Sequence, residues 1–234
     1  MLLLSTRKGL ITLDEGPDGR WRVADVTFRG TSVGYACGDR RTGATWAALL
    51  HGHWGPKLHK RTDGTWRELT TPSYPEGSML RGGKPATLEN IWVVQPGGDD
   101  EPGRVYLGTN PGGLFACDDG ETFELVRPLW DHPSRLGDAD GDRPEWAQGW
   151  FGGGRDTAGL HSVVVDPRDS AHVYIGVSCA GVFETRDGGA SWAPRNRQRL
   201  VQPGRWRALA QPRAPLPADL RGALRLTQRP SRAW

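Results

Sequence analysis

Four carboxylates stand in segments that are expected to be loops, where they could carry out acid–base chemistry: Glu89, Asp131, Glu145 and Asp156. Hydrolysis of a glycosidic bond uses two such groups, one protonated beside the leaving oxygen and one acting across the ring as nucleophile or base. Glu89, Asp131 and Glu145 are therefore the candidate catalytic residues. No local motif around them identifies a reaction, so catalysis is one of two interpretations, the other being binding alone.

A second set of residues could bind a ligand without transforming it. Basic groups bind anions, amides form directional hydrogen bonds, and tryptophan rings stack on flat or sugar rings. The candidate ligand-binding residues are Arg7, Lys8, His51, His53, Lys57, Asn110, Trp130, His132, Arg135, Trp146, His161 and Asn196. Each has a plainer interpretation, because Arg7 and Lys8 could be a solvated hairpin tip and the tryptophans could anchor a loop. His51 and His53 have the spacing of metal ligands on a strand, but no acidic or thiol cluster accompanies them, so neither a metal nor another cofactor is expected.

These candidates need a framework, and the composition indicates which kind. The chain has 234 residues with 33 Gly, 18 Pro and 11 Trp. Abundant Gly and Pro together with many aromatic residues is typical of short strands joined by tight turns, since the rings need a core in which to pack. No apolar run approaches the ~20 residues that a membrane-spanning helix requires, so no membrane partner is expected.

The charge is divided unevenly along the chain. Residues 1–194 contain 20 Lys or Arg and 26 Asp or Glu, whereas residues 195–234 contain ten Arg and one acid. The segment 195–234 is rich in Arg and Pro and lacks strand alternation, which predicts a disordered or out-of-frame tail. It has no interleaved aromatic platform, so nucleic acid is not an expected partner. Three widely spaced cysteines and no visible export signal indicate the cytoplasm.

An internal repeat organises residues 1–194. Residues 1–13, 104–116 and 172–184 align, each as a strand, a Gly-containing turn and a second strand. An Asp-Gly pair and an aromatic residue follow each unit, and a further strand precedes two of them. The complete unit is therefore a meander of four short strands, which would expose an apolar face unless neighbouring units stacked around an axis. This predicts the blades of a β-propeller, with a first blade that begins at its second strand.

Residues 185–192 match the pattern Ser/Thr-x-Asp-x-Gly-x-Ser/Thr-Trp at every defined position, and residues 116–123 depart from it at Ala116 and Phe123. The sequence thus resembles the sialidase-type Asp-box (BNR) repeat propellers, which include bacterial proteins often labelled glycosyl hydrolase and the photosystem assembly factors. The resemblance implies an all-β fold of four-stranded antiparallel blades, here about four and incomplete. In such a turn the Asp and hydroxyl groups bond the backbone and the indole packs beneath it. The predicted structural residues are Asp63, Asp118, Gly120, Phe123, Asp187, Gly189 and Trp192.

The meander also predicts which residues share a face of the propeller. Successive turns alternate between the two ends of a blade, so the Asp-box turns lie at one end and His51, Asn110 and His161 at the other. We expect that second end to bind a polar or anionic ligand, either a glycan or a small molecule. The alternatives are a sialidase-like glycoside hydrolase, although the Arg triad and Tyr–Glu pair of sialidases are not recognisable, and a protein-assembly scaffold. Open blade edges would also permit self-association.

Overall fold

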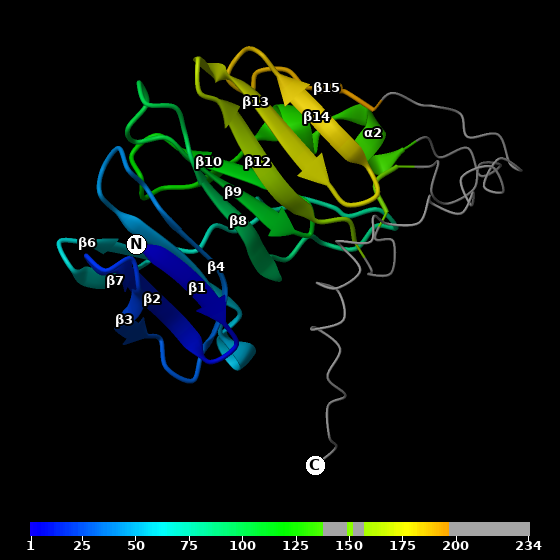
Figure 1. The fold of residues 1–234 in the computed structure, drawn as a ribbon. Helices are drawn as coiled ribbons and strands as arrows, with labels where there is room; N and C mark the ends of the chain where they lie inside the picture. The colour runs from blue at the N-terminus through cyan, green and yellow to red at the C-terminus, as the bar shows by residue number, and fades with distance from the viewer. Residues whose placement is uncertain (138–148, 152–156, 197–234) are drawn as a thin grey trace, which may run out of the picture. The chain divides into compact units, whose positions relative to one another are not determined.

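The computed structural model describes residues 1–137, 149–151 and 157–196 (Figure 1). The chain divides into two units, Met1–Asn196 and Arg197–Trp234, and the description below concerns the first. Of the predicted site residues, Glu145 and Trp146 lie outside the described residues, as does nearly all of the predicted tail.

Four antiparallel sheets, each built from strands that are consecutive in sequence, make up the described part. The first sheet contains β1 (Leu2–Thr6), β2 (Gly9–Glu15) and β3 (Trp21–Thr27). The second contains β4 (Ser32–Gly38), β5 (Thr45–Leu50), β6 (Pro56–Thr62) and β7 (Thr65–Leu69). The third contains β8 (Asn90–Pro96), β9 (Val105–Asn110), β10 (Leu114–Cys117) and β11 (Glu124–Leu125). The fourth contains β12 (Leu160–Asp166), β13 (Asp169–Val177), β14 (Gly181–Thr185) and β15 (Ala193–Pro194).

In the described ranges, helical structure is confined to three short segments: η1 (Gly52–Trp54), α1 (Arg127–Trp130) and α2 (Pro133–Leu136). Helix α1 follows the third sheet directly, and Pro128 and Pro133 stand in the first turns of α1 and α2, where their missing N–H groups cost no hydrogen bond. Among the described residues, no helix has the length and apolar character needed to cross a membrane.

The sheets are blades of a β-propeller, which confirms the predicted fold class. The first strands of successive sheets contact one another, β4 with β8 and β8 with β12. Only four residues, 28–31, join β3 to β4, so β3 ends at the same end of the fold at which β4 begins. In a four-stranded blade the fourth strand ends there, which places β3 in the fourth position. The strand β1 therefore occupies the second position, and the first sheet has no innermost strand among the described residues.

The core lies between the faces of neighbouring sheets. Side chains of the second and third sheets, including Trp46, Leu107 and Phe115, are at most 1% exposed. Leu160 and Ile175 of the fourth sheet are equally buried against the third. Full burial of one such side chain contributes about 1.5–3 kcal/mol relative to exposure, so these faces hold the blades together.

The first and fourth sheets each present one face that no other described sheet covers. On the first sheet Leu2 is 49%, Leu4 47% and Val23 61% exposed. On the fourth sheet Val164 is 58% and Val182 41% exposed. Open apolar faces of this kind are uncommon on monomeric proteins.

Candidate ligand-binding face

The turns of the blades lie at two opposite ends. The loop face, as we name it, carries the turns between second and third strands, residues 7–8, 51–55, 111–113 and 178–180, and the connections between sheets. The Asp-turn face carries the other turns of each blade. Hydrogen bonds within each end agree with this division. Ser178 N donates to Gly159 O on the loop face, and Lys60 Nζ donates to Gly120 O on the Asp-turn face.

Asn110 and Glu89 form a polar pair at the loop face, where β9 ends and β8 begins. Asn110 is 1% exposed, and its Nδ2 donates to Glu89 Oε2 at 2.7 Å. Thr157 Oγ1 donates to Asn110 Oδ1 at 3.2 Å. Both ends of the amide are therefore engaged within the fold, and they orient the Glu89 carboxylate.

Tyr74 lies near this pair and is buried. Its hydroxyl donates to Pro111 O at 2.6 Å and lies 2.8 Å from Thr109 Oγ1. A Cβ added at Gly113 would lie 2.6 Å from the hydroxyl oxygen, so the ring needs glycine there. Burial raises the pKa of Tyr74, which keeps the phenol neutral. This disfavours a nucleophilic role of the kind that sialidases assign to tyrosine.

Trp130 and Arg135 belong to the segment that joins β11 to β12, and Trp130 packs into the core formed by the second and third sheets. The Trp130 ring is 4% exposed and lies 4.8 Å from the Tyr74 ring. The Arg135 guanidinium lies 3.7 Å from the centroid of the Trp130 ring, and its Nη1 donates to Met79 O at 3.0 Å. Arg135 Nε also donates to Trp130 O. These contacts anchor the segment that follows β11. They agree with the interpretation that Trp130 anchors a loop and does not bind a ligand.

The two residues between Trp130 and Pro133 differ in their contacts. His132 Nδ1 lies 2.8 Å from Ser134 Oγ, and the imidazole packs edge-on against Phe183. Burial lowers the pKa of His132, so the ring is neutral at pH 7. Asp131 Oδ2 lies 3.0 Å from Arg127 Nε, one helical turn earlier, in an exposed ion pair.

Three candidates lie on or next to the turn between β5 and β6: His51, His53 and Lys57. His51 and His53 are exposed, and Trp54 beside them is 75% exposed, more than any other large hydrophobic residue described as exposed. The turn is closed by hydrogen bonds from Trp54 N to His51 O and from His51 N to Gly55 O. Lys57 Nζ forms an ion pair of 2.8 Å with Glu68 on β7. The sequence predicted His51 and His53 as ligand-binding residues but not Trp54, which only its exposure in the structure singles out.

The remaining candidates lie apart from this turn. Arg7 and Lys8 are exposed at the turn between β1 and β2. His161 is exposed near the start of β12, with Nδ1 2.8 Å from Ser162 Oγ. The side chain of Asn196 bridges two backbone groups, since its Nδ2 donates to Ala180 O and its Oδ1 accepts from Val182 N.

The turn between β14 and β15, where residues 185–192 match the sequence pattern at every defined position, uses its side chains internally. Asp187 Oδ1 accepts from Ser191 N at 2.9 Å and from Thr185 Oγ1 at 2.7 Å. Gly189 N donates to Thr185 Oγ1, and Trp192 Nε1 donates to Gly189 O. Hydrogen bonds from Ser191 and Thr185 lower the pKa of Asp187 to about 2. A carboxylate held in this way stabilises its turn and is not available as an acid.

The incomplete box after β10 is built around a different aspartate. Asp119 Oδ1 accepts from Glu121 N at 2.7 Å and from Thr122 N at 2.8 Å. Asp118, at the position that the pattern assigns, instead lies 3.0 Å from Arg104 Nε with 78% of its side chain exposed. Sequence reasoning therefore missed Asp119.

The backbone and packing of the turns explain the predicted structural residues Asp63, Gly120 and Phe123. Asp63 and Gly64 join β6 to β7 with φ values of 51° and 81°, the conformation of the two-residue turns that fit twisted hairpins. Gly120 has a φ of 70°, which favours glycine. The ring of Phe123, in place of the usual tryptophan, packs edge-on against Trp46 at 6.2 Å.

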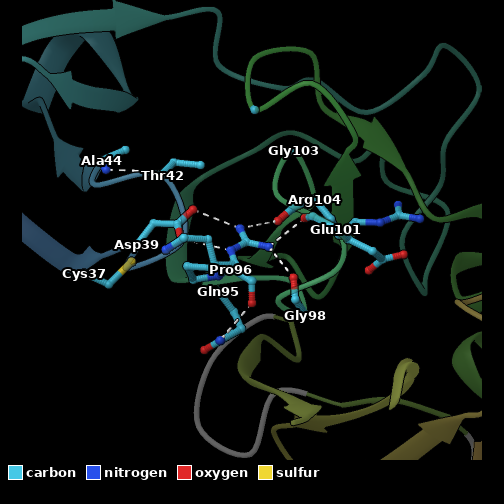
Figure 2. A network of polar contacts seen from close by, with 12 residues as sticks. Cys37, Asp39, Thr42, Ala44, Gln95, Pro96, Gly98, Glu101, Gly103 and Arg104 are labelled. Atoms are coloured by element: carbon cyan, nitrogen blue, oxygen red, sulfur yellow. Dashed lines mark hydrogen bonds and ion pairs between the residues drawn. The ribbon is translucent and has the colours of Figure 1, made fainter. Parts of the chain in front are cut away.

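A buried ion pair links the second and third sheets on the Asp-turn face. Arg41 Nε and Nη2 donate to the two Asp39 oxygens at 2.9 Å, and its side chain is 7% exposed. The same guanidinium donates to the carbonyls of Gly98, Glu101 and Arg104 in the turn between β8 and β9. Figure 2 shows Asp39 facing this turn. Burial raises the pKa of Asp39, but the bonds from Arg41 outweigh it and the pKa lies below its ordinary value.

A pocket of about 260 Å³ lies beside this ion pair. Trp46, Lys60 and Asp119 contribute to its lining, and Lys60 Nζ lies 5.1 Å from the centroid of the Trp46 ring. No predicted catalytic or ligand-binding residue lines it. Within the described ranges, no group of three or more His, Cys, Asp and Glu residues is placed to hold a metal ion.

Comparison with known proteins identifies the fold. No family model and no curated protein matches the sequence. A GH74 enzyme of Niastella koreensis is similar in structure, with a TM-score of 0.51 and 15% identity over 82% of this chain and 27% of that chain. For a GH74 xyloglucanase from Xanthomonas campestris the TM-score is 0.48, with 18% identity over 79% of this chain and 25% of that chain. For YCF48 from Cyanidioschyzon merolae the TM-score is 0.45, with 15% identity over 84% of this chain and 52% of that chain. The chain thus spans between a quarter and about half of these proteins, and the likeness is one of fold alone.

Proposed function

We propose that this chain forms part of a β-propeller that binds a polar ligand of the glycan class on its loop face. The observation that carries the proposal is the exposure of Trp54 on a short turn that also carries the exposed His51 and His53. An indole that is 75% exposed costs solvation free energy unless it covers an apolar surface in a complex. The flat face of a sugar ring is such a surface, and imidazole groups can donate hydrogen bonds to its hydroxyls.

The Glu89 carboxylate supports the same class of ligand. Asn110 holds it at the loop face, and the carboxylate can accept hydrogen bonds from hydroxyl groups. Binding is favoured over hydrolysis because the two described catalytic candidates already have partners, Glu89 with Asn110 and Asp131 with Arg127.

The test is calorimetric titration of the full chain with two oligosaccharides, neutral cellohexaose and anionic 3′-sialyllactose. We expect one of them to bind and Trp54→Ala to weaken that binding about tenfold. Trp21→Ala is the matched control, because Trp21 is also exposed, at 48%, but lies on β3 away from the turn. A parent chain that binds neither sugar, or a Trp54→Ala variant that binds as tightly as the parent, would falsify the proposal. Release of reducing ends during incubation would favour the hydrolase interpretation.

A further inference from the structure

Two turns of the repeat contain the same side-chain arrangement. In the turn between β4 and β5, Asp39 Oδ1 accepts from Arg41 N at 3.0 Å and from Arg41 Nε at 2.9 Å, and Asp39 Oδ2 accepts from Nη2 at 2.9 Å. In the turn between β12 and β13, Asp166 and Arg168 form the same three bonds at 2.9, 2.9 and 2.8 Å. The aspartate fixes the orientation of the guanidinium in both turns.

The two guanidinium groups differ in what lies beyond the aspartate. Arg41 donates to three backbone carbonyls of the next sheet, and 7% of its side chain is exposed. Arg168 is 85% exposed, and Asp166 is its one hydrogen-bonding partner among the described residues. Arg168 is thus oriented as Arg41 is, without the carbonyls that Arg41 binds.

The faces of the sheets differ in the same way. Aligned by strand register, Tyr106 and Leu114 of the third sheet correspond to Tyr174 and Val182 of the fourth, and Gln95 corresponds to Val164. Tyr106 and Leu114 are at most 3% exposed because the fourth sheet covers them. Val164 and Val182, in contrast, are 58% and 41% exposed. The open face therefore carries two exposed valines, with an oriented cation at one end. The Glu184 carboxylate lies on the same face, where it pairs with His172, Arg186 and Arg195.

We propose that this face of the fourth sheet is a docking surface for a further antiparallel sheet of the same repeat, whose first turn presents backbone carbonyls to Arg168. The pair of second and third sheets shows the chemistry on both sides of such an interface. Each charge-assisted bond to a carbonyl adds to the stabilisation that burial of the valine side chains provides.

A second copy of this chain fits the surface less well. Its first sheet could cover Val164 and Val182 with the exposed side chains of Leu2, Leu4 and Val23. That sheet, however, has no described innermost strand, and so no turn between first and second strands for Arg168 to bind. The occupant that can both cover the exposed valines and bind the guanidinium is a complete four-stranded sheet.

The experiment supplies such a sheet from the protein itself. A second copy of residues 86–126, which contains the turn that Arg41 binds, is inserted into the full chain between Asn196 and Arg197. Hydrogen exchange is then measured in the parent and the extended chain, each with and without Arg168→Gln. We expect the amides of the inserted strands to be protected, and Arg168→Gln to speed their exchange about tenfold or more. In the parent chain, which has no inserted strands, we expect Arg168→Gln to leave the exchange of the fourth sheet's amides unchanged, because the guanidinium is exposed there.

Two further measurements keep the outcome decisive. Val164→Asp tests the apolar part of the surface, and we expect it to remove protection from the inserted strands while the third sheet keeps its own. Sedimentation of the parent chain tests the other occupant: a dimer that Val164→Asp abolishes and Arg168→Gln leaves intact would assign the surface to a second copy. Unprotected inserted strands, or an equal effect of Arg168→Gln in parent and extended chains, would also overturn the proposal.

Discussion

The Arg41 side chain forms two parallel hydrogen bonds with the Asp39 carboxylate and, from the same guanidinium, three more with carbonyls of the next sheet. We predict that Arg41→Gln lowers the free energy of unfolding by about 3–5 kcal/mol, because it leaves the buried Asp39 carboxylate uncompensated. The measurement is urea unfolding followed by circular dichroism at pH 7.

Arg67→Gln is the control for this prediction. Arg67 pairs with Glu121 between the same two sheets, but both side chains are more than half exposed. Ion pairs exposed to this extent contribute about 0–1 kcal/mol. A loss at Arg41 no larger than that at Arg67 would show that the buried pair does not hold the sheets together.

The incomplete Asp-box turn gives a second prediction. Asp119→Ala removes the acceptor of two backbone N–H groups, whereas Asp118→Ala removes a largely exposed partner of Arg104. We expect the thermal midpoint to fall clearly in Asp119→Ala and to change little in Asp118→Ala. The reverse order, measured by differential scanning calorimetry, would assign the turn to Asp118.

The low pKa of Asp187 predicts a pH dependence of stability. Its pKa is about 2 in the folded chain against an ordinary value of 3.8, so the folded state favours the ionised form. The stabilisation is fully present above about pH 4 and is lost as the pH falls from 4 toward 2. In Asp187→Asn, which has no carboxylate there, unfolding free energy should depend less steeply on pH in that window. Identical slopes for the variant and the parent would contradict this.

The three free cysteines should differ in reactivity toward iodoacetamide at pH 8. Burial raises the pKa of Cys37 to about 12, so about one thiol in ten thousand is ionised at that pH. Burial also raises the pKa of Cys117, and Cys179 is the exposed thiol. Mass spectrometry of peptides should find Cys179 modified first, with Cys37 and Cys117 modified upon unfolding. Early modification of Cys37 in the folded chain would show that the second and third sheets separate.

The blades could be predicted from sequence because each sheet is formed by neighbouring strands and local turns. The role of Asp119 could not be predicted, since the pattern does not show how the turn forms when Ala116 replaces the Ser or Thr whose hydroxyl would bind within it. In the complete box the Thr185 hydroxyl binds both Asp187 and Gly189 N, and without that hydroxyl the turn forms around the next aspartate. The burial of Trp130 and Arg135 was also beyond the local pattern, because Tyr74 and Met79 come from segments more than 50 residues earlier.

Every register in this fold is set between strands that follow one another along the chain, and no strand is exchanged between sheets among the described residues. A duplication or deletion of one whole sheet would therefore leave the hydrogen-bonded ladders of the others intact. Genes for such chains can change in length by in-frame steps of one repeat, with each step altering interfaces between blades and leaving the blades themselves unaltered.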